Sequence, residues 1–149
     1  MTRILPVFVY GSLLPGFGNH NRYVKPYPHT LQPAIVRGHL YHFSAGYPGL
    51  LRGESGTVKG ALLTFSKDVY EEALAGLDEL EDYFGPGDPR NEYERVEESV
   101  MKMPGGEEIR AFLYRYVKED WARREGIYIP SGDWAGFIKD RQRDSRQGE

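Results

Sequence analysis

The alternation of apolar and polar residues along this chain is typical of a β-rich protein. Runs of apolar and β-branched residues predict strands near Leu5 to Tyr10, Ala34 to Phe43, Val58 to Phe65, Tyr93 to Met101 and Ile109 to Val117. Glycine or proline interrupts nearly every junction, and the Pro104-Gly105-Gly106 turn indicates that the last two strands form a hairpin. Long helices do not alternate with these strands. The pattern therefore favours an α+β fold, a small mixed β-barrel with flanking helices, over a doubly wound parallel sheet.

Helical patterning is clear in one segment, which begins near Ser66 and continues to about Tyr83. Ser66 can cap this helix, and a second, weaker helix is expected between Gly18 and Val24. From Lys139 onward the chain is almost entirely charged and polar, so we expect a frayed, flexible tail over 139–149. The preceding residues, 1–138, are expected to form one domain with one active site.

The long helix contains one carboxylate that departs from its amphipathic pattern. A helical wheel at about 100° per residue gathers on one buried arc Val69, Tyr70, Ala73, Leu74, Leu77 and Leu80. Asp78 and most other carboxylates fall on the solvent-facing side, whereas Glu81 is aimed at the core. Burial of a carboxylate is costly and raises its pKa toward the value that a general base needs, so Glu81 is a candidate catalytic residue.

Two other interpretations of Glu81 stay open at this point. Glu81 could form a structural ion pair with Arg95, or the helix could end before Glu81, so that the wheel would not apply to it.

The first predicted strand leads directly into a second candidate feature, the turn Tyr10-Gly11-Ser12-Leu13. Glycine permits a sharp turn and a close approach to a ligand, and successive N–H groups in such a turn can hold an anion. Ser12 is a weak candidate nucleophile, because it lacks the Gly-x-Ser-x-Gly pattern and the histidines show no triad spacing. We therefore interpret the turn as a binding cradle.

Composition narrows the possible chemistry further. The chain has 149 residues, of which 40% are hydrophobic and 28% charged, so it is expected to fold as an ordinary globular domain. It has no cysteine, which excludes a thiolate nucleophile and fits a reducing, cytoplasmic location. The net charge of −3 argues against nucleic-acid binding, and the first residues resemble neither a signal peptide nor a membrane span. The four histidines show no metal-ligand spacing and are interpreted as surface residues.

Four short motifs follow one another in order along the chain: Tyr10-Gly11-Ser12-Leu13, Leu77-Asp78-Glu79-Leu80-Glu81, Glu92-Tyr93-Glu94-Arg95 and Ala111-Phe112-Leu113-Tyr114. Together they resemble the γ-glutamylcyclotransferase-like (AIG2-like) family. The second resembles the family's Leu-Asp-x-x-Glu, with Glu81 at the catalytic position. Two further segments, Gly46-Tyr47-Pro48-Gly49 and Ser131-Gly132-Asp133-Trp134, resemble a bacterial branch. The segment from Asp82 to Glu92 is a long insertion relative to the family, either a lid or a longer loop.

The resemblance implies a reaction as well as a fold. A γ-glutamyl amine or γ-glutamyl amino acid would close to 5-oxoproline and release its amine, with Glu81 as the acid/base. The cradle from Tyr10 to Leu13 would hold the substrate, Tyr93 and Tyr114 would line the pocket, and no metal or organic cofactor would be needed. The oligomeric state is left open. Alternatives are a small-ligand binding domain that uses the same pocket, or an interaction module with the Trp121 to Trp134 segment as its contact patch.

Overall fold

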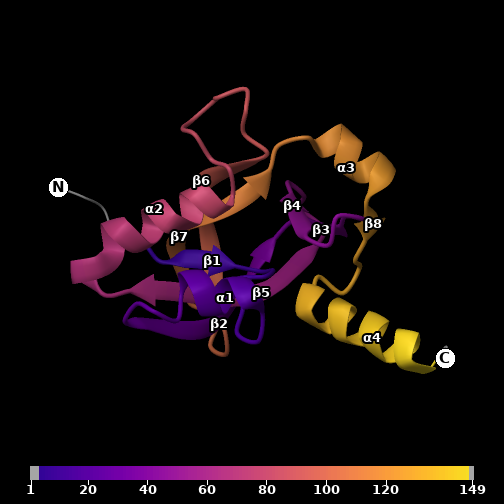
Figure 1. The fold of residues 1–149 in the computed structure, drawn as a ribbon, viewed down its shortest axis with the longest axis horizontal. Coiled ribbons are helices and arrows are strands. Elements are labelled where there is room, and N and C mark those ends of the chain that lie inside the picture. The colour runs from indigo at the N-terminus through magenta and orange to yellow at the C-terminus, as the bar shows by residue number, and fades with distance from the viewer. Residues whose placement is uncertain (1–3, 148–149) are drawn as a thin grey trace.

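The computed structural model describes the backbone of residues 4–147 and the side chains of residues 4–142 (Figure 1). Met1 to Arg3 and the last two residues of the expected tail lie outside the described residues. In chain order the elements are β1 (Val7–Val9), α1 (Gly18–Tyr23), β2 (His29–Arg37), β3 (His39–His42), β4 (Pro48–Leu51), β5 (Thr57–Phe65), the 3₁₀ turn η1 (Lys67–Val69), α2 (Tyr70–Leu80), β6 (Tyr93–Lys102), β7 (Glu108–Tyr116), α3 (Glu119–Glu125), β8 (Ile127–Tyr128) and α4 (Trp134–Gln147).

Five strands close into a barrel in the order β1-β5-β2-β6-β7, and the remaining strands form a small sheet in the order β4-β3-β8. Strand β1 pairs antiparallel with β5 and parallel with β7, which makes the barrel mixed. The predicted hairpin is β6 with β7, paired from Tyr93 opposite Tyr116 to Met101 opposite Glu108. The expected class, a small mixed β-barrel with flanking helices, is confirmed.

One predicted strand is in fact two. The run from Ala34 to Phe43 divides at Gly38, where the chain leaves the barrel as the end of β2 and enters the small sheet as β3. A Cβ atom at Gly38 would lie 2.8 Å from the carbonyl oxygen of Leu51, so this crossing point needs glycine. The division matters because β3 brings its neighbour β4 to the mouth of the barrel.

Helix α2 packs along one side of the barrel (Figure 1), and it is shorter than predicted. A 3₁₀ turn precedes it, Ser66 makes no side-chain capping bond, and regular helix ends at Leu80. The predicted inward face is confirmed, since Tyr70, Ala73 and Leu77 are buried. The helix thus carries its last residues toward the end of the barrel where β1 finishes.

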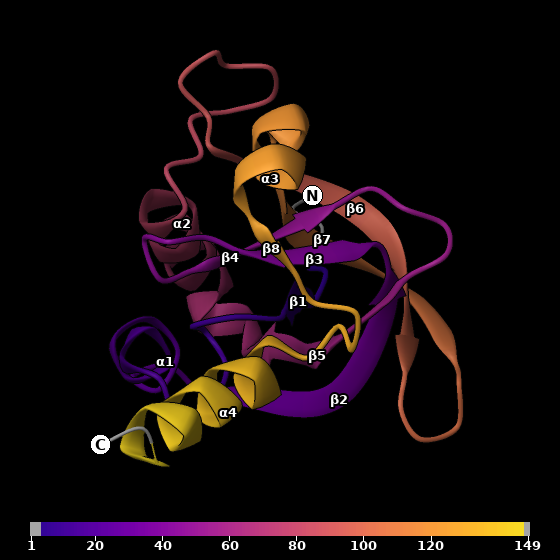
Figure 2. The same ribbon diagram turned by 90° about the vertical axis from the view of Figure 1, so that its right-hand side faces the viewer.

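Helix α4 extends into the segment for which the charge pattern predicts a frayed, flexible tail. Helix α4 continues to Gln147, so the expected boundary at residue 138 falls inside it, although Lys139 to Gln142 are exposed. At its start Trp134 donates a hydrogen bond of 3.1 Å from Nε1 to Nδ1 of His42, and its ring lies 5.0 Å from that of Phe17. Figure 2 shows α4 below α1 in that view. His42 is buried, as is His20, and the surface assignment of these two histidines is wrong. Within the described residues no helix is long and apolar enough to cross a membrane.

Barrel closure predicts a specific glycine requirement at Gly60 in β5. A Cβ atom there would lie 2.1 Å from the carbonyl oxygen of Val9 in β1, whereas one at Gly76 in α2 would meet only a ring carbon of Tyr23 at 3.7 Å. We expect Gly60→Ala to lower the free energy of unfolding by about 1 to 3 kcal/mol, because β1 must move. Gly76→Ala should raise it by about 0.5 to 1 kcal/mol, through higher helix propensity. Denaturant unfolding of both variants checks this, and equal effects would contradict it.

Candidate active site

A pocket of about 220 Å³ opens where β1 ends, between the end of α2 and the start of β4. All seven residues predicted from the sequence line it: Tyr10, Gly11, Ser12, Leu13, Glu81, Tyr93 and Tyr114. These residues come from β6, β7, the end of α2 and the turn after β1. The fold therefore brings together groups that are far apart in the sequence.

The turn after β1 has its carbonyl groups engaged and its N–H groups available. Leu14 N–H donates to the Gly11 carbonyl, His20 N–H to that of Ser12, and buried His20 Nδ1 to that of Leu13 at 2.8 Å. In the described part of the chain the N–H groups of Gly11, Ser12 and Leu13 have no protein acceptor. Three successive uncommitted donors beside a pocket form an arrangement suited to a carboxylate or an oxyanion.

Gly11 is required by the wall that faces the turn. A Cβ atom at this position would lie 2.6 Å from Cγ of Pro48, the first residue of β4 and a member of the pocket lining. A proline ring cannot swing aside as a long side chain could. Any larger residue at position 11 must therefore displace β4 as well as occupy ligand space. Glycine at this position is thus required for folding, in addition to the role in binding that the sequence suggests.

Glu81 is positioned by the way in which α2 ends. Its N–H still donates to Leu77, while Asp82 adopts a left-handed conformation with φ of 53°. Asp82 N–H then bonds the Glu79 carbonyl and Tyr83 N–H that of Asp78, the paired bonds of a Schellman helix end. The helix does end before Glu81, as one interpretation allowed. Because the next N–H bonds fold back on the helix, Glu81 keeps its inward direction.

The carboxylate of Glu81 faces the pocket without a protein partner. Within the described residues it makes no hydrogen bond or ion pair, and Arg95 is paired with Asp78 at 2.6 Å, so the proposed ion pair with Arg95 is wrong. Burial, reinforced by the nearby charges of Glu92 and Asp82, raises the pKa of Glu81 to about 7. A carboxyl group with this pKa can accept and return a proton near neutral pH.

Asp78 is a correction to the helical wheel. The wheel predicts a solvent-facing side chain, but the carboxylate of Asp78 accepts 2.6 Å hydrogen bonds from Arg95 and from the hydroxyl of Tyr114. The guanidinium of Arg95 in turn stacks 4.9 Å from the ring of Phe112. Asp78 thereby fixes one pocket wall and holds Arg95 in an ion pair that does not involve Glu81.

The three predicted pocket tyrosines all donate their hydroxyl hydrogen to the protein. Tyr10 donates to the carbonyl of Tyr114 at 2.6 Å, Tyr93 donates to the carbonyl of Pro48, and Tyr114 donates to Asp78. Burial raises the pKa of each hydroxyl far above its ordinary value. Their rings and hydroxyl oxygens can contact a ligand, but these groups are framework donors, not proton donors to a substrate.

Several lining residues had no role assigned from the sequence. Asn19 donates from Nδ2 to Oγ of Ser12 at 2.8 Å, and Tyr47 donates to Oε1 of Glu92 at 2.7 Å. Tyr47 and Glu92 stood within the family-like motifs, so a signal existed for both. Asn19 had no such signal, because its role depends on α1 packing against the turn. The other lining residues without a role assigned from the sequence are Phe8, Val9, Pro48, Leu80 and Asp82.

The arrangement combines one base with several N–H donors. The hydroxyl of Ser12 has Asn19, not a histidine, as its hydrogen-bond partner, which gives it no activating base. Across the described residues no cluster of three or more histidine and carboxylate side chains could hold a metal ion. Proton transfer with stabilisation of a negative group is thus the chemistry that these residues can carry out.

Comparison with known proteins identifies relatives of this chain. Residues 7–136 match the family described as gamma-glutamyl cyclotransferase, AIG2-like. The gamma-L-glutamyl-butirosin B gamma-glutamyl cyclotransferase of Niallia circulans is 40% identical over 115 residues, which cover 77% of this chain and 69% of that protein.

Solved structures show the same fold. An uncharacterized protein of Pyrococcus horikoshii has 22% identity and a TM-score of 0.64, covering 93% of this chain and 97% of its own. An AIG2-like protein of mouse has 22% identity and a TM-score of 0.60, covering 79% and 82%. At this identity the likeness concerns the fold alone.

The raised pKa of Glu81 predicts how stability varies with pH. Between its ordinary value of 4.5 and about 7, the unfolded chain releases this proton while the folded chain keeps it, so Glu81 lowers stability as pH rises. Glu81→Gln cannot ionise. We expect the variant to match the wild type near pH 4 and to exceed its unfolding free energy by on the order of 2 to 3 kcal/mol near pH 8. Denaturant unfolding at both pH values tests this, and a difference independent of pH would refute it.

Proposed function

The chain belongs to the gamma-glutamyl cyclotransferase, AIG2-like family, and on this premise we propose that it converts a γ-glutamyl amine or γ-glutamyl amino acid to 5-oxoproline and a free amine. The observation that carries the proposal is the uncommitted carboxylate of Glu81, which lines the same pocket as three uncommitted N–H groups. The cysteine-free sequence is compatible with a reducing compartment, and we place the reaction in the cytoplasm.

The reaction begins with a proton transfer. The substrate's α-ammonium is not nucleophilic until it loses a proton, and Glu81, with a pKa of about 7, accepts it. The amine nitrogen then attacks the γ-carbonyl carbon and forms the ring's new C–N bond. Negative charge develops on the carbonyl oxygen at this step.

Collapse of that intermediate completes the reaction. The bond from the γ-carbon to the leaving nitrogen breaks as Glu81 returns its proton to that nitrogen. The ring nitrogen, which still carries two hydrogens after the attack, gives up its second proton through the same carboxylate to the departing amine, which leaves as an ammonium ion, so that protons balance. The N–H groups of Gly11, Ser12 and Leu13 hold the α-carboxylate or the oxyanion. Bent binding in a small pocket supplies the proximity that ring closure needs.

Removal of the proposed base tests the function directly. For Glu81→Gln we expect kcat for 5-oxoproline release to fall roughly 100-fold or more, while substrate binding survives, because shape is kept and proton acceptance is lost. Glu79→Gln is the matched control, since Glu79 lies two residues away, exposed and outside the pocket lining. Chromatographic detection of 5-oxoproline from a panel of γ-glutamyl amides gives the rates.

Two results would reject this proposal. One is the absence of 5-oxoproline from every member of the panel; the other is a folded Glu81→Gln protein whose turnover equals that of Glu79→Gln. Tight ligand binding without turnover would instead support the binding-domain alternative.

A further inference from the structure

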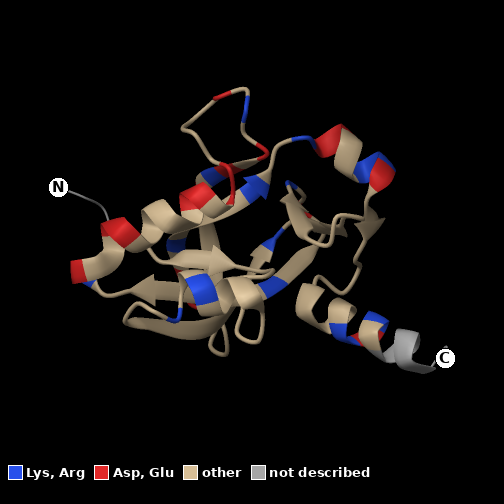
Figure 3. Ribbon diagram, in the orientation of Figure 1, with Lys and Arg blue, Asp and Glu red and all other residues tan. Residues whose placement is uncertain are grey.

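The pocket has a strongly one-sided charge. Its described lining contains three carboxylates, Glu81, Asp82 and Glu92, and no lysine, arginine or histidine. If Glu81 is the base, Asp82 and Glu92 have no assigned role in the chemistry. Both lie at the two ends of the loop that joins α2 to β6, and Figure 3 shows acidic positions at both feet of this loop.

Asp82 combines an unfavourable conformation with an unpaired charge. Its φ of 53° places it where glycine or asparagine is preferred in a Schellman helix end. Its carboxylate makes no hydrogen bond or ion pair with any described residue, and it lines the pocket while remaining exposed to solvent. Helix termination therefore does not require this carboxylate.

Glu92 is fixed at the opposite foot of the loop. Its carboxylate accepts a hydrogen bond from Tyr47, and its carbonyl accepts one from Val117 N–H at 2.9 Å. The loop itself is fastened by buried Asn91, which accepts from Phe84 N–H and donates to the carbonyl of Gly85, both at 2.8 Å. Two acidic groups are thus held at the pocket by an ordered loop.

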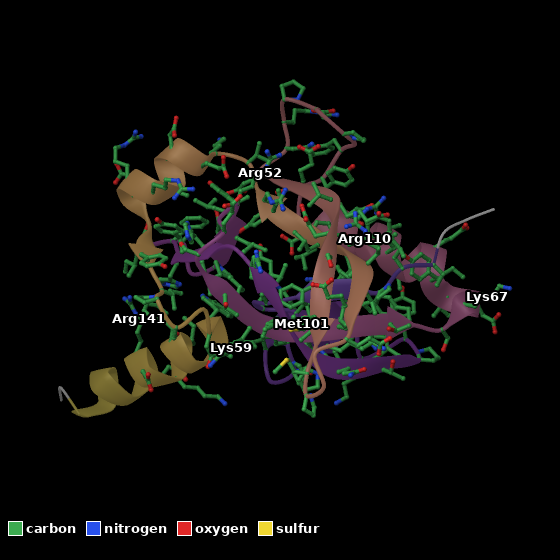
Figure 4. The ribbon with its side chains drawn as sticks, turned by 180° about the vertical axis from the view of Figure 1, so that it is seen from behind. Arg52, Lys59, Lys67, Met101, Arg110 and Arg141 are labelled. Atoms are coloured by element: carbon green, nitrogen blue, oxygen red, sulfur yellow. The ribbon has the colours of Figure 1, made fainter. Side chains whose placement is uncertain are left out.

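The basic side chains of the described residues lie outside the pocket lining, and two arginines form ion pairs with acidic residues there. Arg95 pairs with Asp78 and Arg115 with Glu98, each at 2.6 Å, and neither lines the pocket. The basic residues labelled in Figure 4 are likewise absent from the lining: Arg52, Lys59, Lys67, Arg110 and Arg141. The negative potential of the pocket is consequently not neutralised by the protein.

We propose that the loop from Asp82 to Glu92 makes this enzyme selective for γ-glutamyl amides whose leaving amine carries a second, cationic group, as diamines, polyamines and amino sugars do. The inference rests on the proposed function. The α-carboxylate of the glutamyl moiety occupies the N–H cradle and its amine faces Glu81, which leaves the departing amine on the side of Asp82 and Glu92. A leaving amino acid would bring its own carboxylate against these two groups, and like charges in contact are costly.

A matched series of substrates tests the selectivity. The γ-glutamyl amides of cadaverine, hexylamine and 6-aminohexanoate have leaving chains of nearly equal length that end in ammonium, methyl and carboxylate. We expect kcat/KM to fall in that order by about tenfold at each step, with the ammonium preference weakening at high salt. Equal kcat/KM for the three would overturn the selectivity and leave the proposed function intact. If none of the three yields 5-oxoproline while another member of the γ-glutamyl panel does, this inference fails and the proposed function stands, whereas absence of 5-oxoproline from the whole panel rejects both.

Substitution of the two loop carboxylates tests whether the loop causes the selectivity. We expect Asp82→Asn and Glu92→Gln each to reduce the ammonium-to-methyl ratio of kcat/KM about three- to tenfold, and the ratio cancels any common effect on Glu81. Asparagine suits the left-handed conformation at position 82, so that variant should fold normally. Glu79→Gln removes the same charge from the exposed end of α2 and should keep the wild-type ratio. Unchanged ratios in both loop variants would overturn the assignment.

Discussion

Closure of the barrel by β1 is the constraint on which the site depends. This strand has only three residues, yet it joins β5 on one side and β7 on the other. Directly after it, the hydroxyl of Tyr10 donates to the carbonyl of Tyr114 and accepts from Leu50 N–H, which ties the barrel to the small sheet. The turn that follows is therefore fixed relative to β4 and α2. The position of the cradle is thus set by the two strand pairings of β1 and by the hydrogen bonds of the buried Tyr10 hydroxyl.

Features governed by local pattern were predictable from the sequence. The buried face of α2, the β6–β7 hairpin and the inward direction of Glu81 follow from periodicity and turn residues over a few positions. Asp78 was misplaced because the wheel sees only its own helix, whereas its partners Arg95 and Tyr114 lie 17 and 36 residues further on. The sequence does not predict helix α4 because its charged second half is typical of a disordered tail. Among its described side chains, Trp134, Phe137 and Ile138 near its start pack against the core.

The insertion between α2 and β6 shows why composition alone could not assign a role to a loop. Glycine, proline and charge indicate an irregular segment, and that is correct for its apex, where Asp88 and Arg90 pair in solvent. Its two ends line the pocket, and they are positioned by the end of α2 and by the hydrogen bond from Val117, the residue directly after β7. These contacts are long-range in sequence, so no local signal marks them.

Most polar groups of the pocket are hydrogen-bonded within the protein and form its framework, and the others can contact a ligand. The pocket tyrosines, Asp78 and the carbonyls of the turn all have protein partners, so a ligand cannot change their positions cheaply. The groups left for a ligand are the carboxylate of Glu81 with its raised pKa, the N–H donors of the turn and the carboxylate of Asp82, beside which Glu92 adds a charge while accepting a hydrogen bond from Tyr47. Preorganised donors and a base need no rearrangement when charge moves, and that is the condition under which electrostatic catalysis is effective. The ordered backbone of the loop likewise places the charges of Asp82 and Glu92 where they discriminate between leaving groups that differ only in their terminal group.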